Sequence, residues 1–68
     1  MKPVVQLSID NNYINQYSSP KDASMATGVN RADIISVCRN RLKTAGGYVW
    51  RYLYDYLHIF DECEVENA

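Results

Sequence analysis

Hydrophobic and polar positions near the start of the chain alternate as expected for a β-hairpin. Within Val4–Ile9 the apolar residues recur at every second position, which predicts a strand with one buried face. A second β-rich run, Tyr13–Tyr17, follows residues 10–12 (DNN), which tolerate the positive φ of a tight turn. Its apolar residues are out of phase, so a bulge or an early strand end is expected there. The alternating positions of the first run are Val5, Leu7 and Ile9.

The pattern then changes to that of a short helix. Ser19 is a good cap, Pro20 suits the first helical position, and Asp22 stands three residues after the cap, as in a capping box. Gly28 allows the chain to leave the helix through the left-handed conformation. These signals predict a helix of about two turns.

A second short helix is predicted directly afterwards. Asn30 offers a cap, and Ile34, Val37 and Cys38 have the spacing of a buried helical stripe. Asn40 can end this helix in the left-handed region. Two short helices joined by a glycine-containing turn form a helix-turn-helix pattern, whose second helix conventionally enters the DNA major groove. The spacing fits an ordinary helical hairpin with solvated arginines equally well.

An aromatic and β-branched run, Tyr48–Tyr52, predicts a third strand that covers the hairpin, with Trp50 closing the core against the helices. The expected fold is therefore a small α+β domain with the order β-β-α-α-β, comprising residues 1–52. Residues 53–68 form an aromatic and acidic extension. Their spacing fits either a helix or a strand, and we favour an amphipathic helix followed by unstructured residues from Glu62 onward.

Charge separates these two parts of the 68-residue chain. The net charge is −1, but residues 1–52 carry seven basic and three acidic groups (+4), whereas residues 53–68 carry five acidic groups and no Lys or Arg (−5). The chain is thus a basic module with an acidic tail. The tail either aids solubility or competes with DNA phosphates for the basic groups. No apolar run approaches a membrane span and no secretory signal precedes the module, so we expect a cytoplasmic location and no membrane partner.

Few residues suit catalysis or metal binding. With two cysteines far apart and one histidine, His58, the chain lacks the paired ligands of a zinc site. Cys38 and Cys63 are expected to be free thiols, although a disulfide between them is the alternative. No nucleophilic set or Walker-type loop is present. We therefore expect no cofactor, no metal and no catalytic activity in this chain itself.

Several segments together resemble the intron-encoded nuclease repeat, a nuclease-associated modular DNA-binding domain of HNH and GIY-YIG homing endonucleases. The resemblance covers roughly Val4 to Tyr52. It implies a helix-turn-helix module that positions a nuclease on duplex DNA, with a nuclease domain in cis or in trans as partner. The matching segments are YSSPKDAS (17–24), TGVN (27–30), Ile34, VCR (37–39) and KTAGGYVW (43–50).

This resemblance makes DNA contact the preferred interpretation of the second helix and of the basic loop 40–47, which would otherwise be a solvated surface loop. Long cationic side chains suit guanine edges or phosphates, whereas shorter polar groups suit nearby bases or phosphates. The expected DNA-binding residues are Lys21, Asn30, Arg31, Ile35, Ser36, Arg39, Arg41, Lys43 and Thr44.

Ile35 departs from the family pattern, which generally has a polar residue there. It would meet a thymine methyl group or pack on the C-terminal segment. We expect a monomer that binds double-stranded DNA. The alternative is a protein-interaction or self-association module that uses Ile35 and the aromatic C-terminal segment as an apolar patch.

Overall fold

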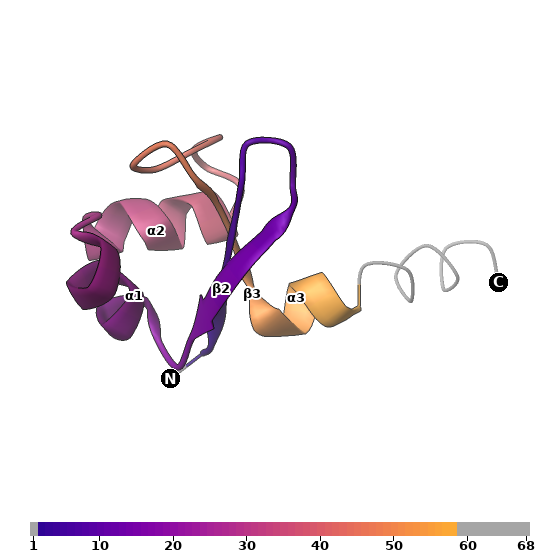
Figure 1. Cartoon of the computed structure of the whole chain (residues 1–68), viewed down its shortest axis with the longest axis horizontal. Helices are drawn as coiled ribbons and strands as arrows, with labels where there is room; N and C mark the ends of the chain where they lie inside the picture. Colours follow the sequence, from indigo (N-terminus) through magenta and orange to yellow (C-terminus); the bar gives the residue numbers. More distant parts are fainter. Residues whose placement is uncertain (1, 59–68) are drawn as a thin grey trace, which may run out of the picture.

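The computed structural model describes residues 2–58 of the chain and confirms the α+β fold (Figure 1). A hairpin is followed by two helices, a closing strand and a short helix. The elements are β1 (Val4–Leu7), β2 (Tyr13–Tyr17), α1 (Pro20–Thr27), α2 (Arg31–Cys38), β3 (Val49–Tyr52) and α3 (Leu53–Leu57).

The three strands form one antiparallel sheet in the order β2-β1-β3, so that the first strand lies in the centre. The predicted bulge is present: Gln6 pairs with Asn15 and Leu7 pairs with Tyr13, which leaves Ile14 as the extra residue. In the preceding turn Asn11 has the positive φ (66°) expected of these residues. The hairpin was therefore predictable from local sequence.

The predicted single buried face of the first strand is wrong, because β1 is buried on both sides. Val4 and Gln6 face α1 and α2, whereas Val5 and Leu7 face the opposite side, and all four side chains are buried. The strand also ends at Leu7, and Ile9 is 68% exposed. Val5 and Leu7 are buried as well because helices cover both faces of the sheet (Figure 1).

The main core lies between the sheet and the first two helices. Trp50, at 0% exposure, packs there as predicted. Its indole Nε1–H donates to the carbonyl oxygen of Ala45 at 3.0 Å, so this polar group is satisfied inside the core. The other buried members of this cluster are Val4, Ala23, Ile34, Val37, Cys38 and Ala45.

Both helix starts follow the predicted capping chemistry. The Ser19 hydroxyl accepts a hydrogen bond from the Asp22 N–H (3.2 Å), and the Asn30 side chain accepts from the Ala32 N–H (2.8 Å). Gly28 ends α1 with a φ of 78°. The helix-turn-helix pattern is thus specified by local residues at each boundary.

The C-terminal segment begins as a helix, α3, which packs across the sheet from α1 and α2 (Figure 1). The ring of Tyr56 lies 6.2 Å from that of Tyr13, which pairs with Leu7 in the sheet. The alternative of a strand is therefore wrong for residues 53–57. The expectations for Cys63 and for the acidic residues from Glu62 onward lie outside the described residues.

Candidate nucleic-acid interface

Helix α2 is held with one side against the core and the other side open. Ile34, Val37 and Cys38 are buried, as their spacing predicts. On the other side Arg31 and Arg39 are exposed, and Ile35 and Ser36 are half-buried. The turn that joins α1 to α2 has only three residues, 28–30, and the two helices pack together. The exposed side of α2 is therefore presented on a fixed scaffold.

The N-terminal end of α2 borders a shallow hollow of about 230 Å³ shared with the start of α1. Lys21 and Arg31 bring two cations to this hollow, and Ile35 supplies its apolar wall beside Pro20. The predicted contact between Ile35 and the C-terminal segment is absent from residues 2–58, because α3 lies on the other face of the sheet. Ile35 instead faces the same hollow as the two cations.

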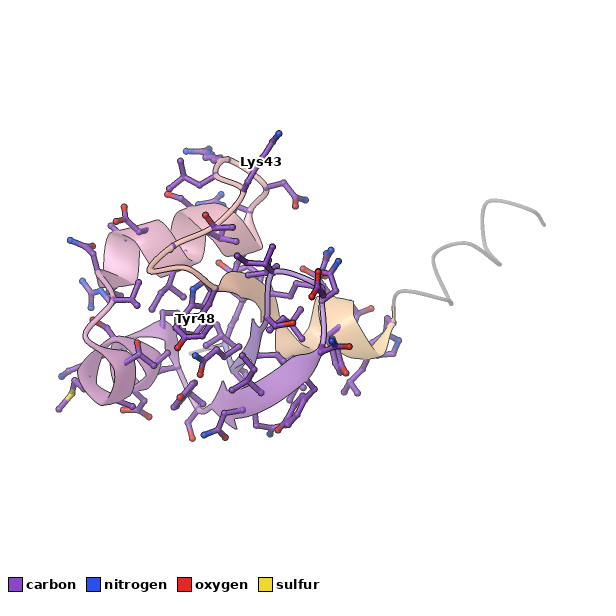
Figure 2. All side chains as sticks on the ribbon, turned by 45° about the horizontal axis from the view of Figure 1, so that its top comes forward. Lys43 and Tyr48 are labelled. Atoms are coloured by element: carbon purple, nitrogen blue, oxygen red, sulfur yellow. The ribbon has the colours of Figure 1, made fainter. Side chains whose placement is uncertain are left out.

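A second and larger hollow, of about 430 Å³, opens at the C-terminal end of α2. We call it the basic groove: it lies between the tip of the β1–β2 hairpin, the loop after α2 and strand β3. Arg41 and Lys43 line it from the loop, and Arg51 lines it from β3. In Figure 2 the Lys43 side chain extends from the loop away from the body of the protein. Ile9 and Asn11 line it from the hairpin.

The path of the loop after α2 is fixed by backbone hydrogen bonds. Asn40 has the predicted left-handed conformation (φ 62°), its N–H donates to the Val37 carbonyl (3.0 Å), and the Arg41 N–H donates to the Ser36 carbonyl (2.8 Å). This pair of bonds is a Schellman motif. It determines the direction in which residues 41–43 leave the helix to line the basic groove.

The two glycines of the loop form a tight turn before β3. Gly46 and Gly47 both have positive φ (61° and 84°), and Ala45 and Tyr48 pair around them, as in a type I′ turn. A β-carbon on Gly46 would overlap a methyl group of Val29.

Tyr48, which follows the turn, lies on the side of the sheet where α1 lies (Figure 2). Its ring meets the Trp50 ring edge-on, with the ring centroids 6.3 Å apart.

Among the expected DNA contacts, Asn30 and Ser36 are already engaged within the fold. The Asn30 side-chain oxygen caps α2, which leaves its amide NH₂ group for a ligand. The Ser36 carbonyl accepts from the Arg41 and Leu42 N–H groups, but its side-chain hydroxyl has no such role. Arg39 and Thr44 are exposed and line neither hollow.

The electrostatics of this side favour an anionic ligand. Residues 2–58 contain seven Lys and Arg side chains and four acidic ones, a net charge of +3. Within this range no Lys or Arg forms a salt bridge to an acidic side chain. Within residues 2–58 the cations around both hollows therefore have no neutralising acidic partner, which favours the approach of a phosphate.

Cys38 lies beneath this surface and is a buried free thiol, as predicted. Burial, with a smaller contribution from the negative charge of Asp55, raises the pKa of the Cys38 thiol to about 12. The thiol is consequently neutral at physiological pH and is not a nucleophile. It serves as a small apolar group in the core.

No three His, Cys, Asp or Glu side chains come together within residues 2–58 in a way that would hold a metal ion. In the same part of the chain, no helix is long and apolar enough to cross a bilayer.

The expected DNA-binding residues do not include Arg51 and Asn11, which line the basic groove. Arg51 lies in a predicted strand rather than in the basic loop, and the sequence around Asn11 indicates only a turn. The usable signal for Arg51 was a cation between Trp50 and Tyr52 in an otherwise apolar strand.

Comparison with known proteins supports the resemblance. The NUMOD1 domain family model matches residues 2–38, which include the hairpin and both helices. An uncharacterized HNH endonuclease of Acanthamoeba polyphaga mimivirus is 39% identical over 51 residues, which cover 75% of this chain and 16% of the viral protein. The chain thus spans about a sixth of the length of that relative. No solved structure matches significantly.

Proposed function

This chain belongs to the NUMOD1 domain family of nuclease-associated DNA-binding modules, and we propose that it recognises a site on duplex DNA through the open side of α2. The observation that supports this most directly is the placement of cations at both ends of that helix, none of which has an acidic partner within residues 2–58. In a helix-turn-helix unit the second helix enters the major groove, and the first helix crosses the DNA backbone. The function is targeting, without catalytic residues of its own.

Roles within the surface follow from side-chain chemistry. Arg31 lies at the N-terminal end of α2, where a recognition helix usually contacts base edges, and its guanidinium can bond guanine O6 and N7 together. Ile35 lies one turn further along the same hollow and would contact a thymine methyl group. Asn30, Ser36 and Arg39 are the remaining candidates along α2.

Phosphate contacts are assigned to the flanking cations and hydroxyls. Lys21 adjoins Arg31 in the first hollow, and Arg41 and Lys43 extend from the loop after α2. Thr44 is exposed beside them and can donate a hydroxyl hydrogen bond. Such contacts position a protein on the duplex but carry no sequence information themselves.

We further propose that the module acts together with a nuclease domain. The viral relative that it resembles is named an HNH endonuclease and is far longer than this chain. A single small module buries about 600–1,000 Å² of protein surface on DNA, which gives modest affinity. Attachment to a second DNA-binding unit raises the effective concentration and therefore the overall affinity.

The test is a titration of the isotope-labelled chain with a mixed-sequence duplex, followed by NMR at about 50 mM and about 200 mM salt. Binding that uses four phosphate contacts should weaken by about two orders of magnitude over this range. We expect amide shifts concentrated in residues 30–44. Unchanged spectra at the lower salt concentration would refute DNA binding.

Exposed apolar side chains around α3 favour protein interaction as a second candidate function. Tyr54 is 68% exposed and Leu57 is 63% exposed, and Tyr13 from the hairpin lies on the same side. Ile35 does not join them, because it lies with α1 on the other face of the sheet. A mass above that of the monomer in sedimentation, abolished by Leu57→Ser, would support this function. A monomer at all concentrations would argue against self-association.

A further inference from the structure

We propose that the basic groove is a binding site for the DNA phosphate backbone, in which Arg51 of β3 and the tip of the β1–β2 hairpin act together with the loop after α2. This inference rests on the proposed function and extends it to residues outside the helix-turn-helix. Most of the groove also lies outside residues 2–38, the part of the chain that the family model matches.

The first argument is the composition of the groove. Three cationic residues, Arg41, Lys43 and Arg51, line it from two separate elements. Within residues 2–58 none of them has an acidic partner. The hairpin contributes Asn11, whose side-chain amide can donate hydrogen bonds to a phosphate oxygen. This combination of unpaired cations and an amide donor suits a phosphodiester.

The second argument is the stiffness of the walls. The loop is fixed at one end by the Schellman motif after α2 and at the other end by Trp50, whose indole bonds the Ala45 carbonyl at 3.0 Å. Arg51 lies in the paired strand β3, where it is half-buried. A site built on such elements loses little conformational freedom when it binds.

The third argument is the position of the groove relative to α2. The eight residues of this helix span about 12 Å, which is close to the width of the major groove of B-DNA, also about 12 Å. Lys21 lies near one end of the helix and the basic groove lies at the other. With α2 in the major groove and Arg31 on base edges, Lys21 and the cations of the basic groove would lie near opposite phosphate backbones.

The apolar rim of the groove fits the same ligand. Ile9 and Leu42 also line the groove and are exposed, and neither belongs to the buried core. Successive phosphates of a DNA strand are separated by deoxyribose, whose carbon atoms offer an apolar surface for these side chains. The hairpin tip would thus contact the sugar next to the bound phosphate.

The experiment compares Arg51→Gln with Lys2→Gln on the same 20-base-pair mixed-sequence duplex. Both variants lose one positive charge, but Lys2 lies at the other end of the sheet with its ammonium group 4.9 Å from the centre of the Tyr52 ring. We expect Arg51→Gln to weaken binding several-fold for every sequence and to reduce the slope of log affinity against log salt by about 0.9. Lys2→Gln should leave the slope unchanged, and Arg51→Lys should restore it.

The outcomes separate this inference from the proposed function. One outcome would overturn this inference alone: the wild-type chain binds and Arg31→Gln weakens binding, but Arg51→Gln behaves like Lys2→Gln. The chain would then bind DNA without using the groove as a phosphate site. If the wild-type chain does not bind at all, both proposals fail.

A measurement on the wild-type chain does not depend on the folding of any variant. Addition of the duplex should shift the NMR signals of the Arg51 guanidinium and the Asn11 side-chain amide. The Lys2 amide should not move. Shifts confined to α2 would overturn the proposal.

Discussion

Gly46 lies against Val29, so that a β-carbon at position 46 would overlap the Val29 Cγ2 methyl and lie 3.3 Å from Cγ1. This contact joins two turns, the one between α1 and α2 and the one before β3, that are 17 residues apart in the sequence. The loop that carries Arg41 and Lys43 therefore packs against the turn of the helix-turn-helix at this point.

Gly46→Ala should therefore destabilise the fold more than Gly47→Ala does. Both residues have positive φ, which costs an alanine about 1–2 kcal/mol. Overpacking against Val29 should add about 1–3 kcal/mol at position 46 alone, because nothing lies within 4 Å of a β-carbon at position 47. Urea unfolding followed by Trp50 fluorescence measures the difference. Equal losses in the two variants, or no relief of the Gly46→Ala effect in a Val29→Ala background, would contradict the contact.

Trp50→Phe should loosen the loop before β3 as well as the core. The substitution removes the indole N–H that donates to Ala45 and leaves space in the main core, at a cost of about 2 kcal/mol or more. Amide hydrogen exchange should accelerate at Tyr48, whose N–H also donates to Ala45, before it accelerates in β1. Uniform acceleration across the domain would indicate that Trp50 acts only through the core.

Ser19→Ala should cost about 1 kcal/mol, because the Ser19 hydroxyl caps α1. The adjacent Ser18 is exposed and provides the control, for which a change within about 0.5 kcal/mol is expected. Thermal unfolding of the two variants by circular dichroism would show this difference. Similar losses in both would mean that the cap adds no stability.

Burial of the Cys38 thiol should make the free energy of unfolding depend on pH in the alkaline range. Its pKa is about 12 in the folded protein against an ordinary value of 9.0, so the unfolded chain releases this proton first. The stability contributed by the neutral thiol should be constant below about pH 9 and should decline as the pH rises toward 12, by about 2 kcal/mol in total at pH 10.5.

Urea unfolding at pH 7.5 and pH 10.5 tests this prediction, with Cys63→Ser as the background so that Cys38 is the one thiol present. The Cys38→Ala variant of that background controls for effects of alkaline pH that do not involve the thiol. Its loss of stability between the two pH values should be smaller than that of the parent. An equal loss would mean that the thiol is not protected by burial.

Local chemistry made most of the element boundaries predictable. Ser19 and Asn30 cap helices because their short side chains reach the next N–H groups, and Asn11 and Asn40 tolerate positive φ. These effects depend on neighbours within four residues, and the sequence displays those neighbours directly.

The features that sequence reasoning missed depend on distant contacts. The burial of both faces of β1 requires α3, which follows some fifty residues later, and the overlap of Gly46 with Val29 depends on how the loop returns to the helices. Arg51 joins the basic groove only because the hairpin tip and the loop after α2 reach the same end of the sheet. At the smaller hollow, the grouping of Lys21 with Arg31 depends likewise on the packing of α1 against α2.

The hydrogen bond from the Leu53 N–H to the Pro3 carbonyl, at 2.8 Å, places the beginning of β1 beside the beginning of α3. The chain therefore enters and leaves the β-β-α-α-β module at neighbouring points on its surface. A unit with adjacent ends can be inserted into a longer polypeptide, or repeated along one, without separating the segments on either side. This geometry gives a physical basis for the exchange of such a module between larger proteins.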